Sequence, residues 1–331
     1  MKTIRVGIIG CGSMSRYHGK EWTKLSGTRV AALCDPSAEM LARYQREVFD
    51  PVDQKPPVFA DYRKMLATVE LDAVTIVTPH TQHFDQTTTA LHAGCHVLLE
   101  KPMVTSTADA RKLIAHAKRK RRVLSIAFPQ AFTPEFAYVR DQFARGNLGN
   151  VVAVDGYITQ NWNRNQRGTW RQDPKLSGGG FAYDSGAHLF NAMLYLPNLR
   201  ARQVFALVDN RGARVDINTA AILRYENGAF GTATSNGDDV RFEDGIYVST
   251  TTGSVRTSFY GGRLEHWDAK GKLIRYPAVK PVPTMHENLA DCIRGRAETP
   301  CPPIWGLRQS LLMDALYKSA HTGKPCNVEP E

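Results

Sequence analysis

The chain has 331 residues, of which 42% are hydrophobic, so it is long and apolar enough for two ordinary domains. Its 42 basic and 32 acidic residues give a formal charge of +10, which favours anionic ligands in general without selecting any one of them. The longest apolar runs have the length of a strand and fall short of the roughly 20 residues of a membrane span, so we expect no membrane association.

The cysteines, the histidines and the N-terminus are typical of a cytoplasmic protein without a metal. The six cysteines are dispersed, with no C-x-x-C pair, so free thiols are expected. The segment from Met1 to Gly12 lacks the long apolar stretch of an export signal. The densest basic run, Lys118–Arg122, has no interleaved aromatic residues, and we interpret it as a solvated helix end rather than a nucleic-acid patch. Four histidines are divided between a predicted helix and a strand, so we expect no metal site from them: His80, His83, His92 and His96.

The first predicted strand, Ile4–Ile9, ends in the loop Gly10-Cys11-Gly12-Ser13-Met14-Ser15, and a helix is expected to continue to Leu25. In a dinucleotide fingerprint the first glycine permits a tight turn and the second lets the backbone approach a pyrophosphate at the helix N-terminus. Ser15 replaces the third glycine, which weakens the pattern without excluding it. The predicted cofactor contacts of this loop are Gly10, Gly12, Ser13 and Met14.

A second predicted strand, Val30–Cys34, ends at Asp35, 23 residues after Gly12. A carboxylate there can accept hydrogen bonds from the adenosine ribose and would repel a 2′-phosphate, and no arginine follows it. The sequence therefore predicts NAD rather than NADP. Asp35 can also serve as the N-cap of a helix that begins near Ser37.

Strands and helices continue to alternate through Ala73–Val77, His96–Leu99 and Val123–Ala127, which predicts a parallel, doubly wound sheet. Ligands bind beyond the carboxyl ends of the strands in such sheets. Two further stretches fall there: one from Thr78 to His83, and Glu100-Lys101-Pro102. Lys101 is therefore expected on the cofactor side.

From Val151 onward the pattern changes to strand-like runs joined by turns, which predicts a mainly antiparallel sheet. Between these runs, Gly178-Gly179-Gly180 precedes Asp184 and His188, which would lie one turn apart on a helix. They can be a catalytic pair, or a first-turn carboxylate beside a histidine of the core.

The segment Asn161–Arg171 has two open interpretations. It can contact a sugar, with stacking tryptophans and with arginines for hydroxyls or a carboxylate, or it can be an arm that reaches a neighbouring subunit. Tyr157 is a weaker pocket candidate, because an aromatic side chain on a strand usually packs in the core. The candidate substrate contacts in these stretches are Tyr157, Trp162, Arg164, Trp170 and Arg171.

The segments GIIGCGSM, CDPS, VTPHTQH, AGCHVLLEKP, GGGFAYDSGAH and LMDALYKSAHTGKP resemble the glucose-fructose oxidoreductase, inositol dehydrogenase and MocA (Gfo/Idh/MocA) family over nearly the whole chain. The resemblance implies an α/β chain with an N-terminal Rossmann domain, residues 1–127. A C-terminal α+β domain with an open-faced, mainly antiparallel sheet would follow, residues 128–304. A final helix at about 305–323 would pack back on the Rossmann domain.

By the same resemblance, Lys101, Asp184 and His188 are the catalytic residues and also contact the substrate. Oxidising a secondary alcohol removes a proton from oxygen while hydride leaves the carbon, which suits an imidazole as base and a lysine that stabilises the developing charge. The cofactor contacts would also include Asp35, Thr78, Pro79, His83, Glu100 and Lys101. One stretch departs from the family: many relatives have an R-F-x-P sequence where this chain has Gln130-Ala131-Phe132-Thr133-Pro134.

These observations predict an NAD-dependent oxidoreductase that acts on a secondary hydroxyl or ketone of a sugar, sugar acid or cyclitol. The alternatives are a lyase or glycosidase that works through a transient keto-sugar, and a non-catalytic sensor of NAD or sugar. No metal and no nucleic acid is expected as a partner. A homodimer or homotetramer formed through the C-terminal sheet is expected, because apolar sheet faces commonly mark interfaces.

Overall fold

The computed structural model describes residues 2–275 and 281–331, which form two compact units. The first unit contains Met1–Val104, Ala108–Ala127 and Pro283–Pro303. The second contains Thr105–Thr107, Phe128–Val282 and Ile304–Glu331. In the described part of the chain, no helix has both the length and the apolar character of a membrane span.

The first unit is built on a six-stranded parallel sheet with the strand order β3-β2-β1-β4-β5-β6. Chain order and spatial order diverge on the two sides of β1, which creates the switch point where such sheets bind ligands. The predicted parallel, doubly wound sheet is confirmed. Its strands are β1 (Ile4–Ile9), β2 (Thr28–Cys34), β3 (Val58–Phe59), β4 (Ala73–Ile76), β5 (His96–Leu99) and β6 (Leu124–Ile126).

The central strands of this sheet are apolar because they are covered on both faces, so their side chains do not alternate between core and solvent. In β4, every residue from Ala73 to Ile76 is buried. The helices of this unit are α1 (Ser13–Lys24), α2 (Ala38–Tyr44), α3 (Tyr62–Thr68), α4 (His83–His92), α5 (Thr107–Lys120) and α10 (Met285–Ile293), with short 3-10 or π turns at Gln45–Phe49, Asp50–Val52 and His80–Gln82.

The second unit contains an eight-stranded sheet with the order β13-β12-β11-β7-β10-β9-β8-β14. Among the strands in the described ranges, only β7 and β10 pair in parallel, so the predicted, mainly antiparallel sheet is confirmed. Its strands are β7 (Val151–Thr159), β8 (Ala201–Asp209), β9 (Asn218–Tyr225), β10 (Phe230–Asn236), β11 (Glu243–Thr250), β12 (Gly253–Thr257), β13 (Leu264–Asp268) and β14 (Cys326–Asn327). The helices are α6 (Pro134–Ala144), α7 (Trp162–Asn165), α8 (Pro174–Ser177), α9 (Gly186–Tyr195) and α11 (Ile304–Thr322), with 3-10 turns at Pro129–Phe132 and Trp170–Gln172.

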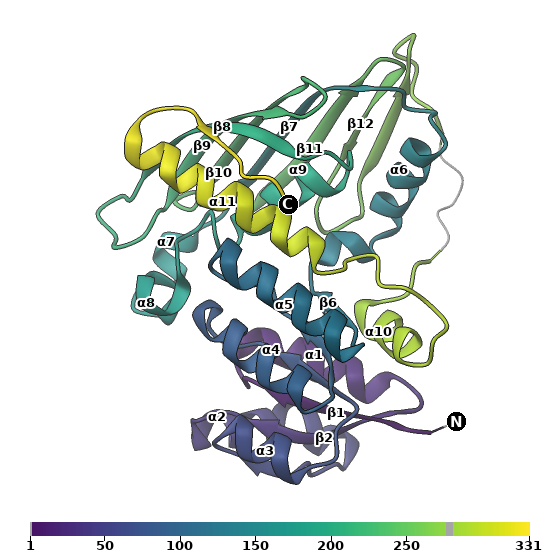
Figure 1. Ribbon diagram of the computed structural model, residues 1–331, viewed down its shortest axis with the longest axis vertical. Helices are drawn as coiled ribbons and strands as arrows, with labels where there is room; N and C mark the ends of the chain where they lie inside the picture. The colour runs from purple at the N-terminus through teal and green to yellow at the C-terminus, as the bar shows by residue number, and fades with distance from the viewer. Residues whose placement is uncertain (1, 276–280) are drawn as a thin grey trace. The chain divides into compact units, whose positions relative to one another are not determined.

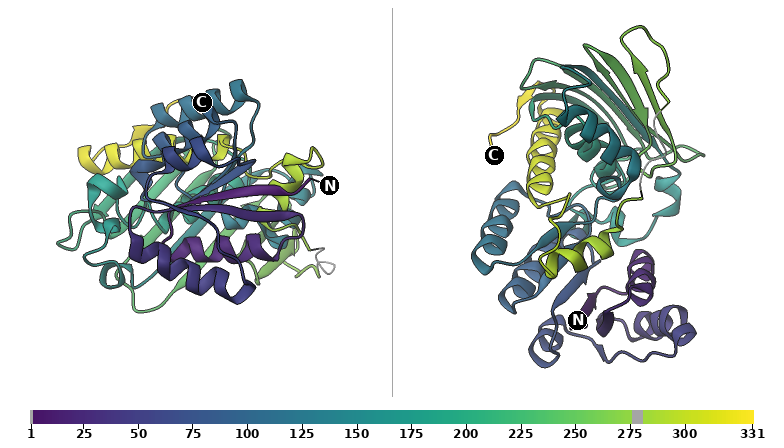
Figure 2. Two further views of the ribbon diagram at one scale, coloured as in Figure 1. Left: turned by 90° about the horizontal axis from the view of Figure 1, so that it is seen from below. Right: turned by 90° about the vertical axis from the view of Figure 1, so that its right-hand side faces the viewer.

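Helices α9 and α11 cover one face of this sheet, α9 against β7, β10 and β11 and α11 against β8 (Figures 1 and 2). Side chains alternate along the strands, as a half-covered sheet requires. The opposite face therefore exposes large apolar side chains from several strands: Tyr157, Leu207, Ile222 and Phe230.

The final part of the chain is divided between the two units. Helix α11 is grouped with the second unit, where it packs against β8 and α9, and its packing on the first unit stays a prediction. Pro283–Pro303 is grouped with the first unit, where its helix α10 contacts α1. The apolar faces of α11 give no signal for which sheet they pack against, since both sheets offer apolar surface.

Candidate active site

The glycine loop of the first unit has the backbone geometry of an anion-binding turn. Gly10 has φ +90°, and a Cβ there would lie 2.3 Å from the carbonyl oxygen of Val77, so only glycine fits. Gly12 is the N-cap of α1, and no side chain caps this helix end. The first turn contains no acidic residue, and the space beside Gly12 is open within 4 Å of an added Cβ. These features fit the pyrophosphate of a dinucleotide at the helix N-terminus.

Asp35 lies at the end of β2 and is held by two backbone amides. Its Oδ2 accepts from Cys11 N and its Oδ1 accepts from Ser37 N, both over 2.9 Å. The N-cap of α2 is Ser37, whose side chain accepts from Met40 N, so Asp35 is not the cap. Each carboxylate oxygen has a further lone pair. Asp35 therefore stands fixed beside the glycine loop, where it fits a ribose diol and opposes a 2′-phosphate.

The ends of β4 and β5 are joined by His83. This buried ring contacts the carbonyl oxygen of Pro102 through Nδ1, over 2.8 Å, and that of Thr78 through Nε2, over 3.0 Å. Burial lowers the pKa of His83, although two carbonyl acceptors favour a charged ring. The Thr78–Pro79 loop and the Glu100-Lys101-Pro102 turn are thus connected by one side chain.

Lys101 follows directly after Glu100 at the carboxyl end of β5, and its side chain is half-buried. The Lys101–Pro102 peptide bond is cis. Glu100 donates its backbone N–H to Ile76 O over 3.0 Å, and its side-chain Oε2 accepts from Lys101 N over 3.1 Å. The predicted cofactor residues of the first unit are therefore gathered at the carboxyl ends of β1, β2, β4 and β5: Gly10, Gly12, Ser13, Met14, Asp35, Thr78, Pro79, His83, Glu100 and Lys101.

In the second unit, the glycine run before the candidate pair is held by Asp216. The buried carboxylate of Asp216 accepts from Gly180 N over 2.6 Å, from Ala182 N over 2.8 Å and from Tyr317 OH over 2.7 Å. A Cβ on Gly180 would lie 1.9 Å from the carbonyl oxygen of Asp216, so a side chain there would push the two segments apart. Burial raises the pKa of Asp216 even though three donors face it.

Asp184 lies in the turn that precedes α9, not within the helix as expected. Its backbone N–H donates to Gly180 O over 3.0 Å, because Asp216 folds the glycine run back on itself. His188 lies in the first turn of α9, whose N-cap is Ser185. Asp184 and His188 are 5% and 6% exposed as whole residues, so both are largely withdrawn from water.

One oxygen of Asp184 accepts two hydrogen bonds. Trp162 Nε1 donates to Oδ2 over 2.8 Å, and Arg171 Nε donates to the same atom over 2.9 Å. The guanidinium of Arg171 also lies over the Trp170 ring, 4.5 Å from its centroid. A carboxylate with two donors on one oxygen is held in one orientation.

His188 is oriented by Gln130. His188 Nδ1 lies 3.4 Å from Gln130 Oε1, while Gln130 Nε2 donates to Asn191 Oδ1 over 2.9 Å and to His188 O over 3.3 Å. Because the Gln130 amide nitrogen is directed to two acceptors, its oxygen faces the imidazole and favours a proton on Nδ1. Nε2 is then the acceptor of the ring, which is the form a general base needs. The Tyr260 ring lies 5.2 Å from the His188 ring.

The other candidate substrate residues differ in burial and in the face of the protein on which they lie. Trp162 is 1% exposed and packs on Phe181, so it cannot stack on a sugar and instead holds Asp184. Tyr157 is also a correction: α9 covers the face of β7 that carries Gly156, and Tyr157 points from the opposite face because strand side chains alternate. Arg164 is exposed on α7, and Trp170 and Arg171 lie in the 3-10 turn that follows.

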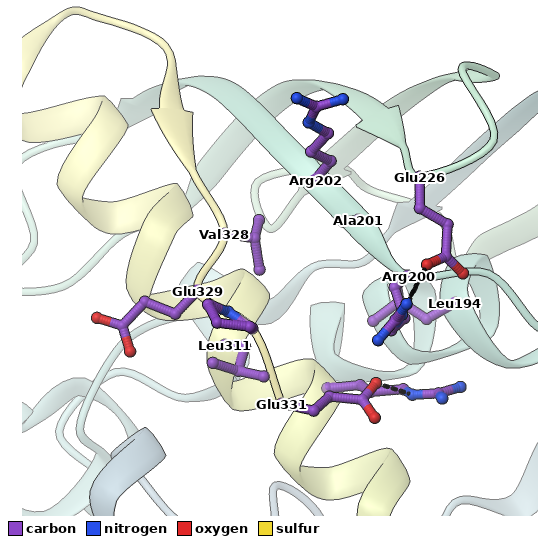
Figure 3. Close-up of a pocket in the computed structure, with 11 residues that line it drawn as sticks. Leu194, Arg200, Ala201, Arg202, Glu226, Leu311, Val328, Glu329 and Glu331 are labelled. Atoms are coloured by element: carbon purple, nitrogen blue, oxygen red, sulfur yellow. Dashed lines mark hydrogen bonds and ion pairs between the residues drawn. The ribbon is translucent and has the colours of Figure 1, made fainter.

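A hollow of about 230 Å³ lies elsewhere in the second unit, beneath the C-terminal segment (Figure 3). Two of its three lining arginines form ion pairs: Arg200 with Glu226, and Arg308 with Glu331 over 2.6 Å. It contains none of the candidate catalytic residues, so we do not assign the chemistry to it. Among residues 2–275 and 281–331, no three histidine, cysteine or acidic side chains gather as a group that could hold a metal ion.

The parallel sheet, the glycine loop before the uncapped N-terminus of α1 and the fixed carboxylate at the end of β2 define a dinucleotide-binding Rossmann fold. The chain belongs to the Gfo/Idh/MocA family. The family model described as "Oxidoreductase family, NAD-binding Rossmann fold" matches residues 4–128, and that of the GFO/IDH/MocA C-terminal domain matches residues 136–256. NAD is thus the cofactor of the first unit.

Several curated relatives act on sugars. D-glucoside 3-dehydrogenase of Escherichia coli is 27% identical over 194 residues, 58% of this chain and 54% of the relative, so the match spans about half of that protein. Levoglucosan dehydrogenase of Pseudarthrobacter phenanthrenivorans is 23% identical over 70% of this chain and 67% of its own length. Among solved structures, an oxidoreductase domain protein from Kribbella flavida has a TM-score of 0.89 at 21% identity, with both chains fully covered. That similarity shows the fold.

Proposed function

We propose that this protein is an NAD-dependent dehydrogenase that transfers hydride between the nicotinamide and a secondary hydroxyl of a sugar, sugar acid or cyclitol. The observation that carries the proposal is the pair in the second unit: Asp184, fixed by two donors on one oxygen, and His188, fixed by Gln130. Family membership and the sugar dehydrogenases among the relatives support the substrate class.

Bound NAD would supply the hydride acceptor, and the residues of the chain would manage the proton. His188 would take the hydroxyl proton on Nε2, since Nδ1 faces Gln130. Lys101 would donate a hydrogen bond to the same substrate oxygen and so stabilise its developing negative charge. Asp184 would accept a hydrogen bond from a neighbouring substrate hydroxyl, with its carboxylate held in place by Trp162 and Arg171.

The substrate contacts proposed outside this set are Arg164, Trp170 and Arg171. Arg171 would act mainly through Asp184, because its guanidinium is already paired with that carboxylate. Trp170 carries Arg171 on one ring face and is half-buried, which leaves part of its surface for a sugar. We propose a cytoplasmic location, in agreement with the dispersed cysteines.

The test is to incubate wild-type protein and Lys101→Ala with NAD and a mixed pool of sugars, sugar acids, cyclitols and glycosides. Products are identified by mass and NADH by absorbance. Loss of two hydrogens with stoichiometric NADH, absent in Lys101→Ala and retained in the control Lys118→Ala, supports the dehydrogenase. Lys118 is exposed at the end of α5 and outside the candidate site. Cleavage of a substrate bond without NADH accumulation contradicts it and indicates a lyase or glycosidase.

We further propose that the open face of the eight-stranded sheet forms a homodimer or homotetramer. The supporting observation is the row of exposed apolar side chains across several strands, among them Leu207 at 61% and Ile222 at 54% exposure. Light scattering of Leu207→Glu/Ile222→Glu should report a smaller particle than the wild type. An unchanged mass would reject this face as the interface.

A further inference from the structure

Three titratable side chains of the first unit are connected by hydrogen bonds in the interior, and the series ends at the Glu100-Lys101-Pro102 turn. His18 on α1 is 0% exposed, and its Nε2 lies 2.9 Å from Glu100 Oε1. His18 Nδ1 lies 2.9 Å from Nε2 of His286 on α10, which is 1% exposed. Glu100, His18 and His286 therefore form one hydrogen-bonded line from the strand end to α10. Neither histidine is used in the proton transfer described above.

The environment of His286 determines which of its ring nitrogens carries the proton. Burial, together with the neighbouring His18, keeps the pKa of His286 well below its ordinary value, so the ring is neutral. Its Nδ1 is buried and has no hydrogen-bond partner among the described residues. Trp22 packs edge-on against the ring at 5.0 Å, and Tyr17 at 5.7 Å. An unpartnered N–H in such a place would lose its hydrogen bond to water, so the single proton of His286 belongs on Nε2, where His18 accepts it.

A proton donated by His286 determines the tautomer of His18. Because His18 Nδ1 accepts, a neutral His18 carries its own proton on Nε2 and donates it to Glu100 Oε1. The opposite tautomer would direct a nitrogen lone pair at the carboxylate, which is repulsive. The other oxygen of Glu100 accepts from the backbone N–H of Lys101 over 3.1 Å. The donor and the acceptor of each hydrogen bond are therefore assigned: His286 donates to His18, His18 donates to Glu100, and Glu100 accepts from the backbone of the candidate catalytic lysine.

We propose that His18 and His286 are positioning residues: His286 sets the tautomer of His18, His18 holds the Glu100 carboxylate, and that carboxylate fixes the backbone at Lys101. The inference rests on the proposed role of Lys101 only for its effect on catalysis. The line does not conduct protons to water, because it ends at the buried Nδ1 of His286, which no other described polar group contacts. It acts as a static support.

The first test is amide hydrogen exchange at Lys101 in the full-length protein, which needs no substrate. Glutamine at position 18 places its amide nitrogen near the position of imidazole Nε2, whereas asparagine places its nitrogen near Nδ1. We expect His18→Asn to speed exchange of the Lys101 amide about tenfold or more, because the Glu100 carboxylate loses its fixed orientation. His18→Gln should restore protection. Equal exchange in wild type and His18→Asn overturns the inference.

The second test uses variants of His286, which contacts His18 but neither Glu100 nor Lys101 in the series of hydrogen bonds. His286→Gln keeps a donor toward His18 Nδ1, and His286→Phe removes it while retaining an aromatic ring against Trp22. We expect Lys101 exchange to rise in His286→Phe alone and ¹⁵N spectra to show the His18 proton leaving Nε2. If either variant unfolds, the wild-type ¹⁵N spectrum still decides: a neutral His18 protonated on Nε2 supports the tautomer assignment. A His18 protonated only on Nδ1, or on both nitrogens, overturns it.

Activity provides a separate readout. If the dehydrogenase activity is present, His286→Phe should lower kcat about tenfold and leave the Kd for NAD unchanged, with recovery in His286→Gln. If no polyol is oxidised by the wild type, the proposed function fails, while the exchange and ¹⁵N results still stand for or against the positioning line. Accelerated exchange without any change of kcat would remove the catalytic part of the inference.

Discussion

Arg171 Nε lies 2.9 Å from Asp184 Oδ2, on the oxygen that also accepts from the indole of Trp162. The side chain of Asp184 is 7% exposed and that of Arg171 26%, so the ion pair is partly shielded from solvent. A pair in that setting is stronger than an exposed one, and both donors constrain the direction of the second oxygen. Arg171 is therefore the residue through which Asp184 can be tested without removing the carboxylate.

Replacing Arg171 by methionine should lower kcat about 10- to 100-fold, since one charge-assisted hydrogen bond is worth about 1.5–3 kcal/mol. The Kd for NADH, measured by the fluorescence of its reduced nicotinamide, should stay unchanged. Arg167→Met is the matched control, because Arg167 is exposed in the same segment. Equal activity of the two variants would show that Asp184 does not depend on Arg171.

Gln130→Met should lower kcat more than it changes KM. The substitution removes the amide oxygen that faces His188 Nδ1 and the N–H that faces Asn191, while roughly keeping the side-chain volume. The imidazole then loses the preference for a proton on Nδ1, which is measurable by ¹⁵N chemical shifts of His188. Gln142→Met on α6 is the control. An unchanged His188 spectrum in Gln130→Met would contradict the orienting role.

Asp216→Asn should destabilise the protein by about 1–3 kcal/mol, measured by urea unfolding. An asparagine presents an amide N–H where the carboxylate accepts from Gly180 N or Ala182 N, so one buried donor loses its acceptor. The neutral side chain removes the burial cost that raises the pKa of Asp216, which reduces the loss. Tyr317→Phe, which deletes only one of the three donors, should cost less. A stabilised Asp216→Asn would contradict this account.

His96 should make the first unit sensitive to acid. Burial and the nearby Arg122 lower the pKa of His96 to about 4, and its Nδ1 accepts from Val123 N over 3.0 Å. An unfolded histidine titrates near about 6.5, so between these values the unfolded chain binds more protons than the folded one. The free energy of unfolding should therefore fall as the pH falls from about 6.5 to about 4.

The check is urea unfolding of wild type and His96→Asn across that pH range. Asparagine offers an acceptor to Val123 N without titrating, so the pH slope should become shallower. It should not vanish, because burial also lowers the pKa of His83 and of His286. An identical slope in both proteins would mean that His96 is not responsible.

The sequence predicted most strands of both sheets, since their apolar patterns are local. Strand β5 has the predicted bounds, His96–Leu99, and the parallel order follows from the alternation with helices. The short strand β12, Gly253–Thr257, was not predicted, because it contains one large apolar residue, Val255, and is defined by its pairing with β11 and β13. A strand that is defined by pairing with distant segments need not show an alternating apolar pattern in its own sequence.

The details of the candidate site depend on contacts that sequence spacing does not reveal. Asp184 was expected inside a helix, but Asp216, far along the chain, folds the preceding glycines into a separate turn. Trp162 and Arg171 were considered as substrate contacts, whereas both donate to Asp184. His18 had one usable signal, a histidine on the buried face of the helix that follows the glycine loop, and its partner His286 lies 268 positions away.

The most direct measurement follows deuterium from substrate carbon to cofactor. The wild-type protein, Lys101→Ala and Lys118→Ala are incubated with NAD and a pool of sugars, sugar acids and cyclitols deuterated on carbon, and the nicotinamide is then analysed by mass. We predict one deuterium on the nicotinamide ring with wild type and with Lys118→Ala, and none with Lys101→Ala. An unlabelled nicotinamide with wild-type protein that binds NAD would contradict hydride transfer from this substrate class.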